Sequence, residues 1–177
     1  MGGGFRWRSW LGLAVVLFLL YGASYVFFAI LVPLTLHNGG PAAAGFLILS
    51  PEADAAVLGR SLEDIGRSDP RLSAYLVTFM DTMCTMMMGM GLLQLGLAWF
   101  GLRSANAWAL WTLAISGLSW IPYTVAISAT FASFGASLGV FEYMFSIIYL
   151  VAPVVGLVAG LAGMKGIGPV GMVTARA

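Results

Sequence analysis

Four long apolar segments, separated by shorter polar ones, dominate the pattern of the chain. They run over about residues 10–36, 73–100, 107–127 and 138–164. A helix needs about 20 predominantly apolar residues to cross the hydrocarbon core of a bilayer, and each segment reaches that length. The pattern predicts an all-α fold: an integral membrane four-helix bundle with a short helical extracytoplasmic loop over residues 37–72. We expect a single membrane domain, residues 1–177.

The polar segment between the first two spans carries signals for short helices. Ser50 followed by Pro51 is typical of an N-cap and a first helical position, and Gly59 is typical of a stop. A second helix start is predicted at Ser61, in the stretch “SLED”, and Pro70 is predicted to open the second span. These signals predict two short helices that lie on the membrane surface.

Composition agrees with a membrane setting. Hydrophobic residues make up 60% of the chain and charged residues 8%, and the mean hydropathy is +0.96. A soluble domain is about 25% charged. The formal net charge is only +1, so no nucleic-acid partner is expected. One cysteine, Cys84, cannot form an intramolecular disulfide, and one histidine, His37, cannot clamp a haem from both sides.

The basic residues near the span ends predict an orientation. One side of the predicted membrane would hold Arg6, Arg8, Arg103, Lys165 and Arg176. The other side would hold only three, in a loop with five acids: Arg60, Arg67 and Arg71. Because cytoplasmic segments are enriched in Lys and Arg, both termini are predicted to be cytoplasmic.

A secretory signal peptide is the alternative interpretation of the first span. Arg6 and Arg8 resemble the basic start of such a peptide, and the stretch “PAAAG” resembles a cleavage site. The apolar run between them is about twice the usual 7–15 residues, so a retained helix is predicted.

The second span contains the unusual stretch “TFMDTMCTMMMGMG”, residues 78–91. Its methionines and Cys84 could supply soft ligands to Cu(I). One helix, however, spreads these methionines around its whole circumference, and a copper site needs two or three converging sulfurs. Methionine also fills irregular gaps in packed helices. We therefore predict packing residues here and no metal site.

Two acids inside the spans, Asp81 and Glu142, have no Lys or Arg within any span to neutralise them. A carboxyl group at membrane depth costs about 2.5–3.5 kcal/mol, and such groups face protein or water. We predict that both lie in one outer-leaflet layer of the bundle interior, with Tyr123 in the same layer and Thr78 and Thr85 beside Asp81. These residues would bind a ligand or cation, or would only join helices by hydrogen bonds; the sequence leaves both open.

Small residues form a stripe on the fourth span, at Ala152, Gly156 and Gly160. Small side chains let two helix backbones approach closely. The stripe is predicted to be a helix contact, either within the bundle or against another protein.

The sequence lacks the signatures of common membrane enzymes, such as HExxH or a phosphate-binding glycine loop, and no catalytic residue or cofactor is assigned. We expect a non-enzymatic accessory or assembly subunit of a larger membrane complex, with other membrane subunits, a second copy and the lipid bilayer as partners. The alternative is a membrane binding or transport module that holds a proton, a cation or a lipid-phase ligand at the buried acids. A weaker third interpretation is an enzyme that uses the same acids.

Two stretches, “LGRSLEDIGRSDPRLSAYL” and “GLLQLGLAWFGLRSANAWALWTL”, resemble small uncharacterised bacterial four-helix membrane proteins. In general build the chain is also similar to DoxX-like proteins. The resemblance covers about residues 58–113. It implies a four-helix bundle in the bacterial inner membrane and carries over no catalytic residue.

Overall fold

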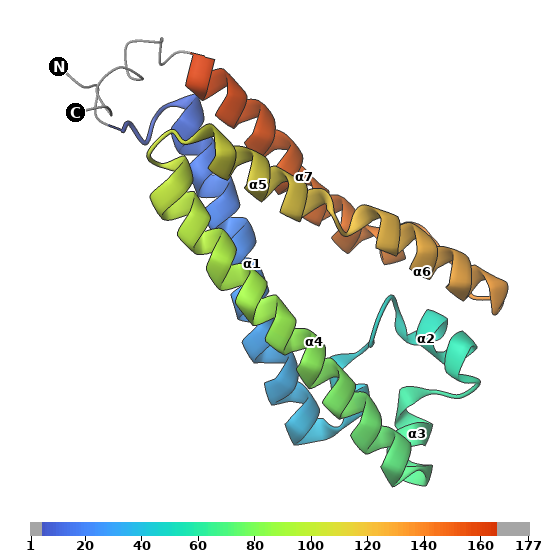
Figure 1. Cartoon of the computed structure of the whole chain (residues 1–177). Coiled ribbons are helices and arrows are strands. Elements are labelled where there is room, and N and C mark those ends of the chain that lie inside the picture. The colour runs from blue at the N-terminus through green and yellow to red at the C-terminus, as the bar shows by residue number, and fades with distance from the viewer. Residues whose placement is uncertain (1–4, 166–177) are drawn as a thin grey trace. The chain divides into compact units, whose positions relative to one another are not determined.

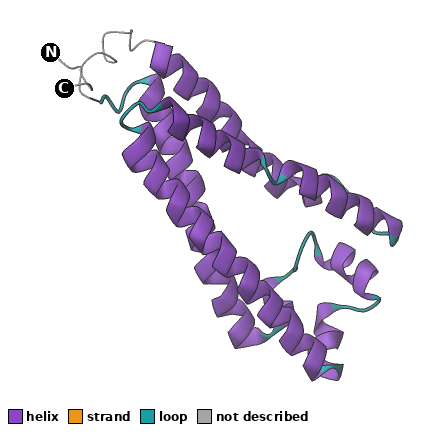
Figure 2. Ribbon diagram, in the orientation of Figure 1, coloured by secondary structure: helices purple, strands orange, loops and turns teal. Residues whose placement is uncertain are grey.

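Every element in the described part of the chain is a helix (Figure 2). The computed structural model describes the backbone of residues 5–165, without the side chains of residues 140–142, 144–146 and 148. Figure 1 shows the course of the chain. In order, the elements are α1 (Trp10–Gly39), η1 (Pro41–Ala44), α2 (Pro51–Leu58), α3 (Leu62–Ser68), α4 (Pro70–Gly96), η2 (Leu97–Leu102), α5 (Ala107–Leu118), α6 (Ile121–Ser133) and α7 (Val140–Lys165).

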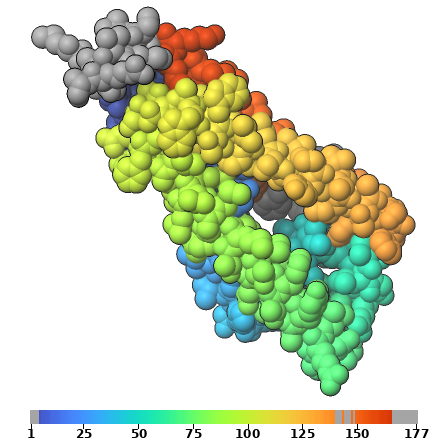
Figure 3. All heavy atoms as spheres, in the orientation of Figure 1, coloured from blue at the N-terminus to red at the C-terminus, as the bar shows by residue number. Residues whose placement is uncertain are grey.

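Within the described residues, three helical stretches are long and apolar enough to cross a membrane. They are Trp10–Gly39, Pro70–Leu102 and Ala107–Ser133, and a shorter apolar helix covers Tyr149–Lys165. The space-filling view in Figure 3 shows α4, in green, at the surface of the molecule. Large apolar side chains of α4 and η2, among them Leu93 and Phe100, are exposed. An exposed surface of this kind is suited to lipid. The chain is an integral membrane protein.

The chain divides into two compact units. Unit 1 comprises Met1–Ala23, Leu92–Ser119 and Ile148–Ala177, and unit 2 comprises Ser24–Gly91 and Trp120–Ile147. Three of the helices, α1, α4 and α7, contribute residues to both units.

Unit 1 has one continuous apolar core. Its fully buried side chains come from α1, η2 and α5 and include Phe18, Leu102 and Leu110. The glycines of α7 allow this close packing: a Cβ atom added at Gly156 would lie 2.8 Å from the Phe18 ring, and one at Gly160 would lie 2.5 Å from Leu110. Backbone contact at small residues is the usual way in which membrane helices approach closely.

A break interrupts the segment that was predicted as one span over residues 107–127. Helix α5 ends at Leu118 and α6 begins at Ile121, because Pro122 has no N–H to donate to the preceding turn. The hydroxyl of Tyr21 on α1 donates a 3.2 Å hydrogen bond to the carbonyl oxygen of Gly117, just before the break. The carbonyl group that Pro122 leaves without its α-helical N–H partner is that of Leu118, so the bond from Tyr21 supports the backbone next to the break. Neighbouring helices commonly support such breaks in membrane helices.

The short helices of unit 2 begin as predicted. Ser50 caps α2 by accepting a hydrogen bond from the Ala53 N–H, and Gly59 ends it in the left-handed region at φ 71°. Ser61 caps α3 through the Asp64 N–H. These helices rest on a small apolar core of Leu62, Ile65 and Leu76.

Candidate binding site at Asp81 and His37

Asp81 on α4 has a partner on α1. The Oδ2 atom of Asp81 and the Nε2 atom of His37 are 2.9 Å apart, and the imidazole donates the hydrogen bond when the carboxyl is ionised. The Asp81 side chain is 35% exposed and that of His37 is 62% exposed. The pair therefore lies at the border of the packed part of unit 2, accessible from outside it.

The position of His37 corrects the expected length of the first helix. The sequence pattern ended the span at about residue 36 and assigned His37 to the loop, but α1 continues to Gly39 with Pro33 inside it. A side-chain hydrogen bond from Asn38 Nδ2 to the Leu34 carbonyl oxygen supports this last turn. The acid that appeared to lack a counter-charge is therefore paired with the only histidine in the chain.

The second carboxylate oxygen of Asp81, Oδ1, is enclosed and has no hydrogen-bond partner among the described residues. Unpartnered buried polar atoms are rare in native proteins. The other three in the described part of the chain are Gln94 Oε1, Trp120 Nε1 and Ser128 Oγ. Three of the four, all except Gln94, belong to unit 2. Unit 2 thus carries unused hydrogen-bonding capacity for water or a ligand.

Thr78 and Thr85 lie one turn from Asp81 but do not bond its carboxylate. The Thr78 hydroxyl donates to the Ala74 carbonyl oxygen at 2.8 Å, and the Thr85 hydroxyl donates to the backbone carbonyl oxygen of Asp81 at 2.9 Å. Such bonds to the preceding turn are common for threonine in helices. Both side chains are exposed, so their methyl groups and hydroxyl oxygens border the carboxylate rather than hold it.

The remaining candidates of the site are only partly located. Tyr123 lies on α6 with a side chain that is 71% exposed, and it makes no hydrogen bond to Asp81 or His37 in the described structure. The backbone of Glu142 belongs to α7, but its side chain lies outside the described residues. A shared layer of Asp81 and Glu142 stays a prediction.

The methionines around Asp81 differ in environment. Met86 and Met90 are exposed, whereas Met83 is half-buried and the Cys84 thiol is buried. No group of three or more His, Cys, Asp or Glu side chains converges in the part of the chain that the structure describes. Methionine packing on several sides of the helix stays the interpretation of this stretch.

A residue whose role sequence reasoning missed is Asp54, which was taken only as an acid near the start of α2. Its carboxylate is buried and accepts hydrogen bonds from the backbone N–H groups of Leu47, at 2.5 Å, and Ile48, at 3.3 Å. Burial raises the pKa of Asp54, and the bonds from Leu47 and Ile48 partly oppose this. Asp54 thus ties the segment before α2 to the helix.

The small-residue stripe of α7 faces its own chain. Gly156 and Gly160 lie against Phe18 and Leu110, and Ala152 is half-buried one turn earlier. Side chains of unit 1 therefore occupy the face that was a candidate for contact with another protein.

No protein-family model matches the chain, and neither a curated protein nor a solved structure shows significant similarity to it. The fold and the site define an integral membrane protein in which a carboxylate on a long apolar helix is paired with an imidazole.

Proposed function

We propose that the protein is a membrane binding or transport module that holds a proton, a cation or an amine-bearing lipid-phase ligand at Asp81. The observation that carries this proposal is the unequal use of the two oxygens of Asp81. His37 occupies Oδ2, whereas the enclosed Oδ1 has no partner among the described residues. A carboxylate oxygen in this state is a ready acceptor for an ammonium group or a proton.

Electrostatics favours a positively charged ligand. Two opposite unit charges about 4 Å apart attract by about 4 kcal/mol at an effective dielectric constant of about 20. Apolar surface for the body of such a ligand would come from Val77 and Met88, which are half-buried and share the helix face of Asp81, four residues before it and seven residues after it. Methionine adapts its shape to varied apolar ligands.

Binding of tetraphenylphosphonium, a permanent lipophilic cation, tests this proposal. The protein in lipid nanodiscs should bind the probe at one site, and Asp81→Asn should weaken binding at least about tenfold, since the lost attraction exceeds 1.4 kcal/mol. Thr82→Val is the matched control: Thr82 lies next to Asp81, is exposed and bonds only the Thr78 carbonyl oxygen. Equal binding by wild type and Asp81→Asn, or an equal loss in Thr82→Val, would refute the proposal.

An accessory or assembly subunit of a membrane complex is the second candidate. The folded segment of α2 and α3, with its own apolar core and the Asp54 clamp, supports it, because a rigid segment outside the spans can recognise a partner. Under this proposal the chain forms a four-helix bundle in a bacterial inner membrane with both termini in the cytoplasm. Purification in a mild detergent followed by native mass spectrometry should then reveal a stoichiometric partner, and a homogeneous single chain would count against it.

A further inference from the structure

The charged residues divide unequally between the two units. Unit 1 contains five basic residues and no Asp or Glu, whereas unit 2 contains all seven acids and three basic residues. The basic residues of unit 1 are Arg6, Arg8, Arg103, Lys165 and Arg176. Arg176 lies outside the described residues. Unit 1 therefore has no carboxylate side chain of its own that could pair with these basic residues.

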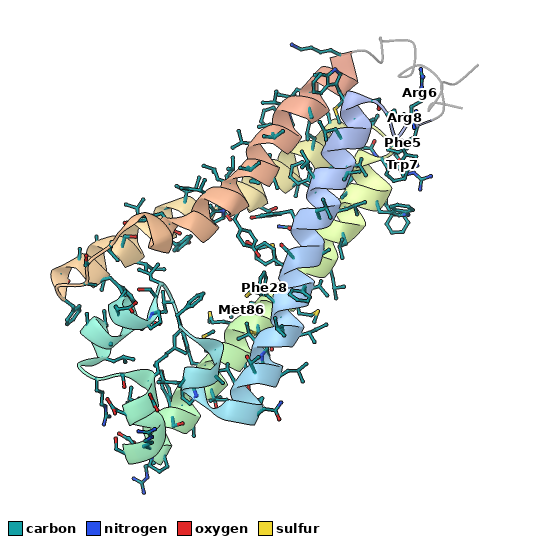
Figure 4. All side chains as sticks on the ribbon, turned by 180° about the vertical axis from the view of Figure 1, so that it is seen from behind. Phe5, Arg6, Trp7, Arg8, Phe28 and Met86 are labelled. Atoms are coloured by element: carbon teal, nitrogen blue, oxygen red, sulfur yellow. The ribbon has the colours of Figure 1, made fainter. Side chains whose placement is uncertain are left out.

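One of these residues, Arg103, lies over two aromatic rings, and Arg6 and Arg8 are the sequence neighbours of two aromatic residues. The guanidinium of Arg103 lies 4.6 Å from the centre of the Trp99 ring and 5.6 Å from that of Phe5. Phe5 in turn packs edge-on against Trp7, with ring centres 4.9 Å apart. Figure 4 shows Phe5, Arg6, Trp7 and Arg8 gathered just before the first turn of α1. We name Arg6, Arg8 and Arg103 with these three rings the arginine–aromatic cluster.

The cluster rests on a folded support. Ser9 caps α1: its hydroxyl accepts from the Gly12 N–H at 3.1 Å and donates to the Arg6 carbonyl oxygen at 2.6 Å. Phe5 and Ala105 pack against the apolar core of unit 1. The segment that carries Arg6 and Arg8 is thereby held next to the turn that carries Arg103.

The guanidinium donors of the cluster are free to bind an anion. Arg6, Arg8 and Arg103 are exposed, and within the described residues none of them forms an ion pair. Stacking on a ring covers the face of a guanidinium but leaves its N–H groups at the edge, where they match the oxygens of a phosphate. This arrangement fixes the direction of the donors.

The aromatic residues specify where the anion would lie. Trp7 and Trp99 are exposed beside the arginines, at the ends of apolar membrane-spanning helices. Tryptophan is enriched at membrane–water interfaces, at the depth of the lipid headgroups. Basic side chains placed there attract anionic lipids. We propose that the arginine–aromatic cluster binds the phosphate headgroup of an anionic phospholipid, with Arg103 as the stacked, oriented donor and Arg6 and Arg8 as flanking donors.

Tryptophan quenching by brominated lipids tests the proposal. The protein is reconstituted in bilayers that contain either brominated phosphatidylglycerol or brominated phosphatidylcholine, and the relative association constant of the two lipids is obtained from the loss of fluorescence. Wild type should prefer phosphatidylglycerol. Arg103→Gln should lower this preference about fivefold, the effect of about one basic side chain at a charged surface. The Arg6→Gln, Arg8→Gln, Arg103→Gln triple variant should abolish it.

A second triple variant serves as the matched control. Arg60→Gln, Arg67→Gln and Arg71→Gln together remove the same number of charges from unit 2 and should leave the preference unchanged. Arg103→Lys keeps the charge but not the planar guanidinium, so its preference for phosphatidylglycerol should lie between those of wild type and Arg103→Gln. This single substitution still tests the proposal if the triple variant does not fold. An equal response to both lipids in wild type, or an equal loss in the control, would overturn the proposal. Loss of the preference for phosphatidylglycerol on addition of inorganic phosphate would also overturn the proposal, because the cluster would then be a site for free phosphate.

Discussion

The two units of the protein are stabilised in different ways. Unit 1 has a continuous core of fully buried apolar side chains, and the small residues of α7 bring its helices together. The apolar cluster described in unit 2 is small, with Leu62, Ile65 and Leu76. Polar contacts also join segments of this unit, among them His37 with Asp81 and Asp54 with the segment before α2. Close packing of apolar side chains is thus the main feature of unit 1, whereas hydrogen bonds and ion pairs join the segments of unit 2.

This difference separates stability from binding. A continuous core of close-packed apolar side chains specifies one packing and leaves little space for a ligand. Polar groups that are only partly satisfied, as at Asp81 Oδ1, cost stability but can be completed by a ligand. We accordingly expect substitutions at Asp81 in unit 2 to change ligand binding, whereas substitutions in the buried core of unit 1 should change the fold.

The largest effect is expected from bulk at the glycines of α7. Gly156→Leu with Gly160→Leu forces side chains into Phe18 and Leu110, which are fully buried and have no space to move. Overpacking costs about 1–3 kcal/mol at each site. Thermal unfolding in detergent, followed by circular dichroism, should show a strongly lowered Tm. Gly89→Leu on the open face of α4 is the control, because nothing lies within 4 Å of a Cβ atom there. Equal melting of both variants would contradict the glycine contact.

A smaller and more local effect is expected in unit 2 from Asp54→Ala. The substitution leaves the N–H groups of Leu47 and Ile48 without their acceptor, at a cost of about 1–3 kcal/mol. Amide hydrogen exchange should accelerate at these two positions and in α2, while the amides of unit 1 keep their protection. Glu52→Ala, an exposed neighbour in the same helix, should change neither. Faster exchange throughout the chain would show that the clamp is not local.

A third variant, Tyr21→Phe, removes the hydrogen bond to the Gly117 carbonyl oxygen and keeps the ring. Hydrogen bonds between membrane helices contribute about 0.6 kcal/mol on average, so the Tm should decrease only slightly. The ring contact of Tyr21 with Tyr149, with centres 5.6 Å apart, should persist. If the Tm decreased as much as in the glycine double variant, hydrogen bonding rather than close packing would be the main source of stability in unit 1.

The smallest effects are pH-dependent and should have opposite signs at two acids of unit 2. Hydrogen bonds from the Leu72 N–H and from Arg60 lower the pKa of Asp69 in the folded protein below its ordinary value of 3.8. Ionised Asp69 therefore stabilises the fold at any pH above 3.8, and this stabilisation is lost as the pH falls through the pKa of the folded state. Burial raises the pKa of Asp54 in the folded protein above its ordinary value of 3.8. Ionisation of Asp54 therefore lowers the stability of the fold at a pH above this raised pKa, and the loss disappears at a pH below 3.8, where the carboxyl is protonated in both states.

Carboxyl-carbon NMR titration measures both groups in one experiment. Asp69 should titrate below 3.8 and Asp54 above it. The same order in an unfolded control, or a reversed order in the folded protein, would contradict the assigned environments.

Local chemistry predicted much of the fold. Hydropathy located the long apolar helices, and the short helices of unit 2 begin at Ser50 and Ser61 because a serine cap acts on an N–H only three residues away. The break after Leu118 was missed, since the segment is uniformly apolar and Pro122 alone does not reveal that both sides continue as helices. The small-residue stripe was visible in the sequence, but not the residues that cover it.

The candidate site was less accessible to sequence reasoning. Asp81 was recognisable because a carboxyl in an apolar run is costly. Its partner His37 lies 44 positions away, and the search for a counter-charge considered only Lys and Arg within the spans. Asp54 was assigned to the helix start, although its carboxylate reaches back seven positions to Leu47. Contacts of this kind depend on which segments of the chain pack together. The hydrophobic periodicity of each helix does not give that information.

The π-helical segment η2 has a consequence for how the chain tolerates changes in length. The N–H of Arg103 bonds the carbonyl oxygen of Ala98, and that of Asn106 bonds the carbonyl oxygen of Gly101, both five residues back. A π turn accommodates one residue more than an α turn, so deletion of one residue within Leu97–Leu102 would leave a helix that can close with ordinary α bonds. After a deletion between Ala98 and Arg103, the Arg103 N–H would bond the same Ala98 carbonyl oxygen four residues back, so the following side chains would keep their direction around the helix axis. Deletion of one residue from a regular α segment would instead turn them by about 100°. With Trp99 retained, Arg103 would stay on the side of the Trp99 ring, so η2 is the part of this stretch in which we expect the loss of one residue to be tolerated.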